Sequence, residues 1–310
     1  MKVNQEYLQN KWAVFGMSLL ACVLWGSAFP ALKIGNQLLG LESGDYAGQL
    51  LFAGYRFLLA GLLLFLALPL FFRESITVSK TELKRLIPFG ILNTGLLYAF
   101  FYNGLANTTA VKGSILNSTG VFFSVLFAHI AYADDKLSWR KAIGVILGLV
   151  GVAVANFDPT GLNLDFALTG EGFVLIAAVI SGAGNILGKN IVGRVHPFLI
   201  TAYQMVSGAI FLLVLGTLLG GTPVLKFTGA SWWLLIYLAF LSATAFGLWY
   251  TVLKYNRVGE VSLYRFLIPV SGSLLAVLLL PGEALSINLL GALLLVSLGI
   301  IIVNYQGRRG

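Results

Sequence analysis

The stretch GVILGLVGVAVAN at residues 144–156 has a counterpart about half the chain away, GALLLVSLGIIIVN at residues 291–304. Both are apolar, contain glycine and end in asparagine. At the same offset, AGYRFLLAG (53–61) resembles TAYQMVSGA (201–209), which pairs Arg56 with Gln204. LNSTGVFFSVL (116–126) likewise lies opposite RFLIPVSGSLL (265–275). The repeat predicts two similar halves, residues 1–158 and 159–310.

The composition is that of a protein embedded in lipid. Hydrophobic residues make up 58% of the chain and charged residues only 10%, whereas soluble domains carry about 25% charged residues. Because Cys22 is the single cysteine, a disulfide framework and a cysteine metal cluster are excluded. The two histidines, His129 and His196, are 67 residues apart in the sequence, so we predict no metal site and no cofactor.

Ten apolar runs are long enough to cross a bilayer as helices, which requires about 20 residues each. The first run follows a polar segment without a small-residue cleavage signal, so we interpret it as a retained span. The predicted spans are 13–35, 48–72, 86–106, 110–132, 139–157, 170–190, 197–219, 231–254, 260–280 and 286–305. Each half therefore holds five spans. Since five is odd, the second half must be inverted relative to the first.

Basic residues alternate from one side of these spans to the other. If the N-terminus is cytoplasmic, 15 of the 20 basic residues fall on cytoplasmic segments, as the positive-inside rule requires. These are Lys2, Lys11, Arg73, Lys80, Lys84, Arg85, Lys136, Arg140, Lys141, Lys189, Arg194, Lys254, Arg257, Arg308 and Arg309. We therefore predict a multi-pass protein of the cytoplasmic (inner) membrane with both termini inside. The charge of +8 reports topology and not a nucleic-acid partner.

Inverted repeats are common in secondary transporters, where the substrate binds near the midplane between the halves. A duplicated bundle with a purely structural role is the simpler alternative. The spans contain no GKT or GKS phosphate loop, and no large soluble domain is present to bind a nucleotide. Transport driven directly by ATP is therefore not expected.

Four segments also indicate a family. They are LWGSAFPALK (24–33), YRFLLAG (55–61), TTAVKGSIL (108–116) and LIPVSGSLLAVLLLPGEALS (267–286). In their order and spacing the chain resembles the EamA branch of ten-helix carriers in the drug/metabolite transporter superfamily. The first half departs from the pattern, with Gly120 opposite Pro269 and Asp134 opposite Glu283. The resemblance implies a central cavity lined by spans 1, 3, 4, 6, 8 and 9, with spans 5 and 10 as scaffold, and alternating access.

Polar and aromatic side chains deep in the spans are candidates for substrate contact, because such groups usually face the interior of a bundle. The candidates are Trp25, Asn93, Tyr98, Tyr102, Asn117, Asn185, Tyr250 and Arg265. Tyr98 and Tyr102 are four residues apart and share a helix face. The simpler alternatives are interfacial aromatic residues for the tyrosines and helix-packing contacts for the asparagines.

The sequence allows two interpretations of Arg265. Its side chain could extend to the headgroups or pair with Glu260, or it could bind a substrate carboxylate through two parallel hydrogen bonds. Arg56, placed near the external end of span 2, is predicted to form a structural or gating ion pair. Lys112 could assist the entry of anions, and Glu260 is the one candidate for a proton relay.

The sequence therefore predicts a carrier for a small polar metabolite, an amino acid or related carboxylate, working as an exporter. A multidrug or organic-cation carrier of the same fold is the alternative, although no acidic residue lies in the middle of a span. A membrane-embedded enzyme is disfavoured by the lack of a catalytic constellation, and a channel by the lack of a filter-like loop. The coupling ion, the direction and the oligomeric state are left open.

Overall fold

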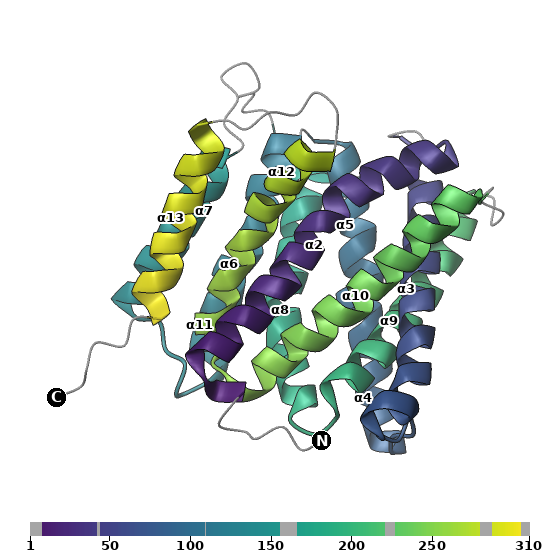
Figure 1. The fold of residues 1–310 in the computed structure, drawn as a ribbon, viewed down its shortest axis with the longest axis horizontal. Coiled ribbons are helices and arrows are strands. Elements are labelled where there is room, and N and C mark those ends of the chain that lie inside the picture. The colour runs from purple at the N-terminus through teal and green to yellow at the C-terminus, as the bar shows by residue number, and fades with distance from the viewer. Residues whose placement is uncertain are drawn as a thin grey trace.

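The computed structural model describes residues 8–41, 44–108, 110–155, 166–220, 227–279 and 287–304, apart from a few side chains within them. Helices account for all the regular structure in these ranges (Figure 1). Five helical segments form the first half: α2 (Lys11–Leu39), α3 (Tyr46–Ala67) with η1 (Leu68–Phe72), α4 (Lys80–Gly90) with η2 (Ile91–Leu96) and α5 (Leu97–Ala106), α6 (Ala110–Ala131), and α7 (Trp139–Ala155).

Five segments form the second half. They are η3 (Leu168–Gly172) with α8 (Phe173–Val192), α9 (Pro197–Leu218), α10 (Gly229–Tyr255), α11 (Val258–Val261) with η4 (Ser262–Phe266) and α12 (Leu267–Leu279), and α13 (Ile287–Asn304). Within the described ranges, eight segments are long and apolar enough to cross a membrane, and Leu290–Asn304 is a shorter apolar helix. The predicted fold class, a ten-helix membrane protein, is confirmed.

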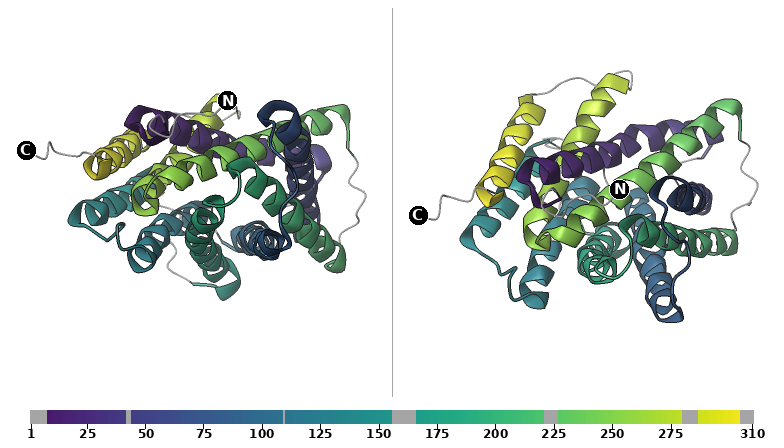
Figure 2. Two further views of the ribbon diagram at one scale, coloured as in Figure 1. Left: turned by 90° about the horizontal axis from the view of Figure 1, so that it is seen from below. Right: turned by 60° about the horizontal axis from the view of Figure 1, so that its bottom comes forward.

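The packing of the helices reproduces the repeat that the sequence predicted. Equivalent helices of the two halves pair directly, α3 with α9 and α7 with α13. The contact of α6 with α8 is likewise matched by that of α12 with α2, as expected for an inverted repeat. The pair of α7 and α13 lies at one edge of the bundle in both views of Figure 2. The predicted boundary at residue 158 lies outside the described residues.

Both described ends of the chain lie at the same end of the bundle, here called the terminal end (Figure 1). Lys11 Nζ donates a hydrogen bond to the carbonyl of Asn304 at 3.4 Å there. Because the helical segments alternate in direction, the connections before α4, α7, α9 and α11 lie at this end too. These connections and the adjoining helix ends carry most of the basic residues.

A buried ion pair fixes the terminal end of α6 and α7. Lys141 Nζ pairs with Asp135 Oδ1, and both side chains are nearly inaccessible to solvent. The other carboxylate oxygen of Asp135 accepts the backbone N–H of Gly259 at 2.8 Å. One carboxylate therefore ties the α6–α7 connection to the start of α11, across the two halves.

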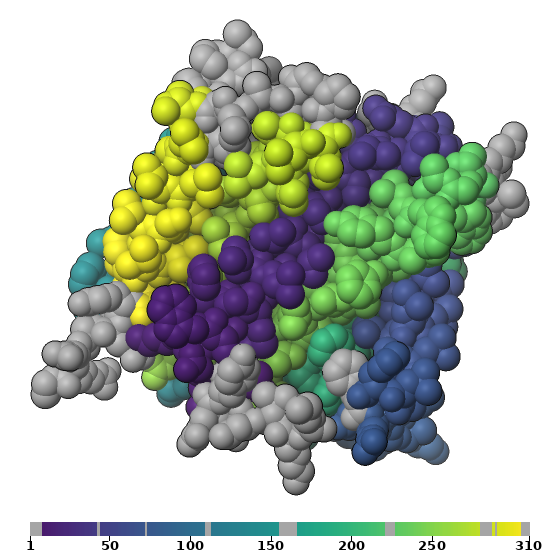
Figure 3. Space-filling view, in the orientation of Figure 1, coloured from purple at the N-terminus to yellow at the C-terminus, as the bar shows by residue number. Residues whose placement is uncertain are grey.

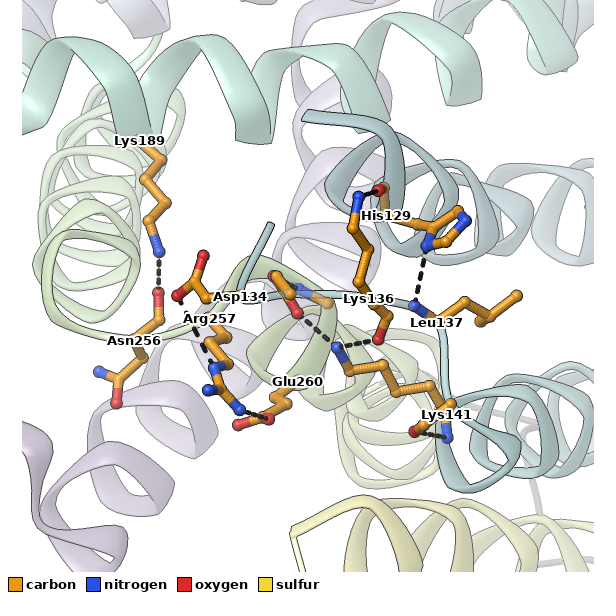
Figure 4. Close-up of polar contacts among 12 residues, drawn as sticks. His129, Asp134, Lys136, Leu137, Lys141, Lys189, Asn256, Arg257 and Glu260 are labelled. Atoms are coloured by element: carbon orange, nitrogen blue, oxygen red, sulfur yellow. Dashed lines mark hydrogen bonds and ion pairs between the residues drawn. The ribbon is translucent and has the colours of Figure 1, made fainter. Parts of the chain in front are cut away.

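Further polar contacts close the same end (Figure 4). Lys189 Nζ donates to the carbonyl of Asn256. Arg257 lies 3.9 Å from the carboxylate of Asp134 and 3.3 Å from that of Glu260. Glu260, the candidate proton relay, is thus an ion-pair partner at the terminal end.

The helices of one face approach closely, with α2 between α12 and α10 (Figure 3). Gly26 of α2 faces α12. A β-carbon at position 26 would lie 2.8 Å from the backbone nitrogen of Gly272 and 2.9 Å from the carbonyl oxygen of Ile268. Such distances to backbone atoms leave no room for a side chain, so glycine sets the separation of the two helices.

We predict that Gly26→Ala destabilises the protein by about 1–3 kcal/mol, because α2 and α12 must move apart. Gly16→Ala is the matched control on the same helix, since a β-carbon there meets nothing within 4 Å. Thermal unfolding in detergent should show a lower Tm for Gly26→Ala, with Gly16→Ala unchanged or slightly raised. Equal Tm values for the two variants would contradict the close packing of α2 on α12.

Candidate functional site

A pocket in the middle of the bundle brings the predicted site residues together. Its lining comes from α2, α3, η2 with α5, α6, α8, α10 and η4 with α12, and none of its lining residues lies on α7 or α13. The eight candidates on this lining are Trp25, Asn93, Tyr98, Tyr102, Asn117, Asn185, Tyr250 and Arg265. That they bind a substrate stays a prediction. The six expected spans contribute, and α3 does so in addition through Arg56.

A chain of hydrogen bonds closes the side of the pocket nearer the terminal end. Asn93 Nδ2 donates to the Tyr250 hydroxyl at 3.1 Å, and that hydroxyl donates to Gln204 Oε1. Gln204 Nε2 in turn donates to Thr94 Oγ1 at 2.9 Å. Asn93 and Thr94 sit on η2, a π-helical turn of the kind often found at functional sites. The chain links η2, α9 and α10.

A second amide connects three other lining helices. Asn185 Oδ1 accepts the indole N–H of Trp249 at 3.0 Å, and its Nδ2 donates to Ser124 Oγ at 2.9 Å. Ser124 Oγ in turn donates a hydrogen bond to the carbonyl of Gly120 at 2.7 Å. Asn185 therefore joins α6, α8 and α10 and also lines the pocket. It makes the helix-packing contacts and also has the pocket position, which the sequence analysis gave as alternatives.

Arg265 points into the pocket and not toward the end of the bundle. It lies on η4, where its Nη2 donates to Ser181 Oγ at 2.9 Å. Its guanidinium carbon lies 5.9 Å from the centre of the Trp249 ring. Glu260, the alternative partner, is paired with Arg257. Arg265 Nε is buried and has no hydrogen-bond partner among the described residues.

Trp25 presents a second donor of this kind. Its Nε1 is buried without a hydrogen-bond partner in the described part of the chain. Its ring lies 5.7 Å from that of Trp249 and 5.0 Å from that of Phe246, edge to face in both cases. Trp25 and Arg265 thus contact the same indole of Trp249. Buried donors are almost always satisfied in native proteins, so it is notable that both of these unpartnered donors belong to side chains that line the pocket.

Arg56 is a pocket residue that the sequence analysis misplaced. It lies in the middle of α3, is 2% exposed, and donates from Nε to Ser242 Oγ at 2.8 Å. Among the described residues, the hydrogen-bond partner of Arg56 is thus a hydroxyl in place of the predicted ion pair. Its depth in an apolar helix was the available signal, because charges at such depth usually face the interior.

The remaining aromatic candidates form one wall. The rings of Tyr98 and Tyr102 lie 6.0 Å apart on one face of α5, as their spacing predicted, and Phe101 packs against both. No aspartate or glutamate is among the described residues that line the pocket. The side chain of Lys112 and the whole of Glu283 lie outside the described part of the structure.

Metal-ligating groups are not gathered anywhere in the described ranges. No group of three or more histidine, cysteine, aspartate or glutamate side chains there could hold an ion. The described groups with which the pocket could bind a ligand are therefore two arginines, amides, hydroxyls and aromatic rings.

Fold and pocket together are those of a multi-pass membrane transporter. The sequence model of the EamA-like transporter family matches residues 11–157 and again residues 168–305. The chain belongs to the EamA-like transporter family.

Curated relatives span nearly the whole chain. "Uncharacterized transporter YoaV" of Bacillus subtilis is 28% identical over 93% of this chain and 95% of its own length. "Probable amino-acid metabolite efflux pump" of Escherichia coli is 24% identical over 91% of each chain. A solved crystal structure that is 20% identical matches with a TM-score of 0.77 over 95% of this chain and 97% of its own. This structural match shows the shared fold.

We predict that Tyr250→Phe lowers the stability of the protein by about 1–3 kcal/mol, because Asn93 and Gln204 would each lose a partner in a buried place. The matched control is Tyr237→Phe, which removes a 2.6 Å contact with the hydroxyl of Ser27 near the surface. Ser27 keeps its bond to the carbonyl of Leu24, so this loss should be smaller. Thermal unfolding in detergent measures both. A Tyr250→Phe protein as stable as the control would contradict the network.

Proposed function

We propose that the protein is a secondary carrier that exports an amino acid or a related small carboxylate across the cytoplasmic membrane. The observation that carries the proposal is the pair of unpartnered donors, Arg265 Nε and Trp25 Nε1, in a pocket whose described lining has no acidic side chain. A carboxylate offers oxygens to both donors and a charge opposite to that of the guanidinium.

The rest of the pocket suits the remainder of an amino acid. The rings of Tyr98, Phe101 and Tyr102 form an aromatic wall. Aromatic faces attract ammonium groups and also bury apolar side chains. The amide of Asn117 adds a donor and an acceptor on the α6 side. The names of two relatives as amino-acid metabolite efflux pumps support the same substrate class.

The direction of opening supports alternating access. The lining continues from Trp25 to Leu32 on α2 and from Asn93 on η2 to Tyr102 on α5, away from the terminal end. At the terminal end the Tyr250 network and the ion pair of Asp135 with Lys141 hold the helices together. In an inverted repeat the exchange of the two halves' conformations would open this end and close the other. Because no acidic side chain is among the described lining residues, exchange or facilitated transport is favoured over proton coupling.

The alternative is a carrier of organic cations or lipophilic drugs, which the aromatic lining would also suit. Two arginines facing the pocket, Arg56 and Arg265, oppose a cation there because like charges repel in a medium of low dielectric constant. An enzyme or a channel has no support of this kind from the pocket.

We predict that Arg265→Gln weakens carboxylate binding by about 10- to 100-fold, because a hydrogen bond to a charged group contributes about 1.5–3 kcal/mol. In the wild type, amino acids in excess over their Kd should raise the Tm of the detergent-purified protein. A screen of amino acids, other carboxylates, organic cations and sugars would measure this shift, followed by uptake and efflux in proteoliposomes.

The control is Lys11→Gln, which removes one cation at the terminal end, far from the pocket. It should bind and transport like the wild type. If organic cations stabilise the wild type and Arg265→Gln equally, and amino acids stabilise neither, the carboxylate assignment is wrong and the cation carrier takes its place.

The terminal end is proposed to be cytoplasmic, because the connections and helix ends on that side carry most of the basic residues. A fluorescent protein that folds only in the cytoplasm, fused after Gly310, should be bright. An alkaline phosphatase fusion at the same place, which needs an oxidising compartment, should be inactive. Reversed signals would show that the orientation is inverted, and with it the direction that we propose.

A further inference from the structure

A second pocket lies at the terminal end, between α4 and α8. Its basic lining residues are Lys84 and Arg85 in the first half of α4 and Arg194 just beyond the end of α8. Its apolar floor includes Pro88, Phe89, Leu92, Leu187 and Ile191. The pocket therefore combines positive charge at the end of the bundle with apolar surface that reaches along the helices.

The charge of this pocket is not cancelled by its surroundings. Arg85 has one acidic neighbour, Glu82, with Nη1 and Oε1 3.6 Å apart. Among the described residues, Lys84 and Arg194 have no ion-pair partner. Asn190 is the remaining polar lining residue, and its Oδ1 already accepts the Tyr132 hydroxyl at 2.9 Å. Two cations are left for a ligand, with the third shared.

The apolar part of the pocket is open to the outside of the bundle. Leu187, which lines it, is 42% exposed, and the neighbouring Ile87 is 40% exposed. In a membrane protein, leucine and isoleucine side chains exposed on the helix surface face acyl chains. An occupant can therefore have its charged part at the level of Lys84 and Arg194 and its apolar part along Leu187.

We propose that this pocket binds the headgroup phosphate of an anionic phospholipid, with an acyl chain along α4 and α8. Basic pockets between transmembrane helices near a membrane surface have the chemistry to hold such headgroups. A zwitterionic amino acid is a poor occupant, because the described lining offers no carboxylate for its ammonium group.

The position of the pocket gives the lipid a consequence for the carrier. The ring centre of Phe89, on the floor of this pocket, lies 6.1 Å from the ring centre of Tyr250. Tyr250 is the centre of the hydrogen-bond network on the terminal side of the first pocket. A phosphate between Lys84 and Arg194 would bridge α4 and α8 just outside that network. Bound lipid should therefore favour the conformation in which the terminal end is closed.

The test uses the full-length protein in nanodiscs of phosphatidylcholine with and without phosphatidylglycerol. The variant is Lys84→Gln/Arg85→Gln/Arg194→Gln, and the matched control is Lys11→Gln/Lys136→Gln/Arg140→Gln, which removes the same charge at the same end. Lipid-dependent Tm and native mass spectrometry report affinity and stoichiometry. We expect one or two tightly retained phosphatidylglycerol molecules on the wild type and on the control, and at least tenfold weaker retention on the pocket variant.

Three results would overturn the proposal. Equal loss in pocket variant and control would mean general attraction to a basic surface. A Tm rise with inorganic phosphate as large as that with phosphatidylglycerol would mean a soluble-anion site. Unchanged retention in the pocket variant would remove the site altogether. If the triple variant does not fold, Arg194→Gln against Arg140→Gln tests the same difference. Because amino-acid binding is measured separately through Arg265→Gln, failure of the lipid site leaves the substrate proposal untouched.

Discussion

The high cost of an unsatisfied polar group in hydrocarbon governs this structure. Backbone groups avoid this cost by forming helices, and polar side chains within the bundle avoid it by hydrogen bonding to partners on other helices. Tyr250, Gln204 and Asn93 satisfy one another between η2, α9 and α10. Each such contact removes a cost and at the same time fixes the relative positions of helices that surround the pocket. Two of the exceptions among the described residues, Arg265 Nε and Trp25 Nε1, belong to side chains that line the pocket and are therefore informative.

The helices and their pairing could be predicted from the sequence because they depend on local hydropathy and on the repeat. Ten apolar runs became ten helical segments with similar ends. The candidate residues could be recognised by their polarity at depth, since there are few ways to place an amide or a guanidinium inside a bundle except toward its centre. Asn93, Asn185 and Arg265 followed this rule.

The direction and partners of individual side chains could not be predicted in the same way. Arg56 was expected to form an ion pair although the predicted start of its span, residue 48, is close to the observed start of α3 at Tyr46. Its partner Ser242 is distant in the chain, so nothing in the sequence indicated this contact. Gln204 gave no signal beyond its pairing with Arg56 in the repeat, because its partners Thr94 and Tyr250 are distant in the chain. The second, basic pocket depends on α4 and α8 meeting, which hydropathy does not report.

The helices follow the symmetry of the repeat, whereas the side chains that line the pocket do not. The helices pair as an inverted repeat, and the proposed mechanism requires the two halves to exchange conformations. The side chains do not follow this symmetry. Arg56 is matched by Gln204, and Arg265 by Leu116. If both halves carried both arginines, four cations would converge on one pocket and repel one another. With one arginine from each half, at positions that are not equivalent, the two ends of the pocket differ. In the proposed complex, the carboxylate of the ligand lies at Arg265 and the rest of the ligand extends toward α5 and α6. In the proposed carrier, the repeat would provide the motion and its departures from symmetry would provide the specificity.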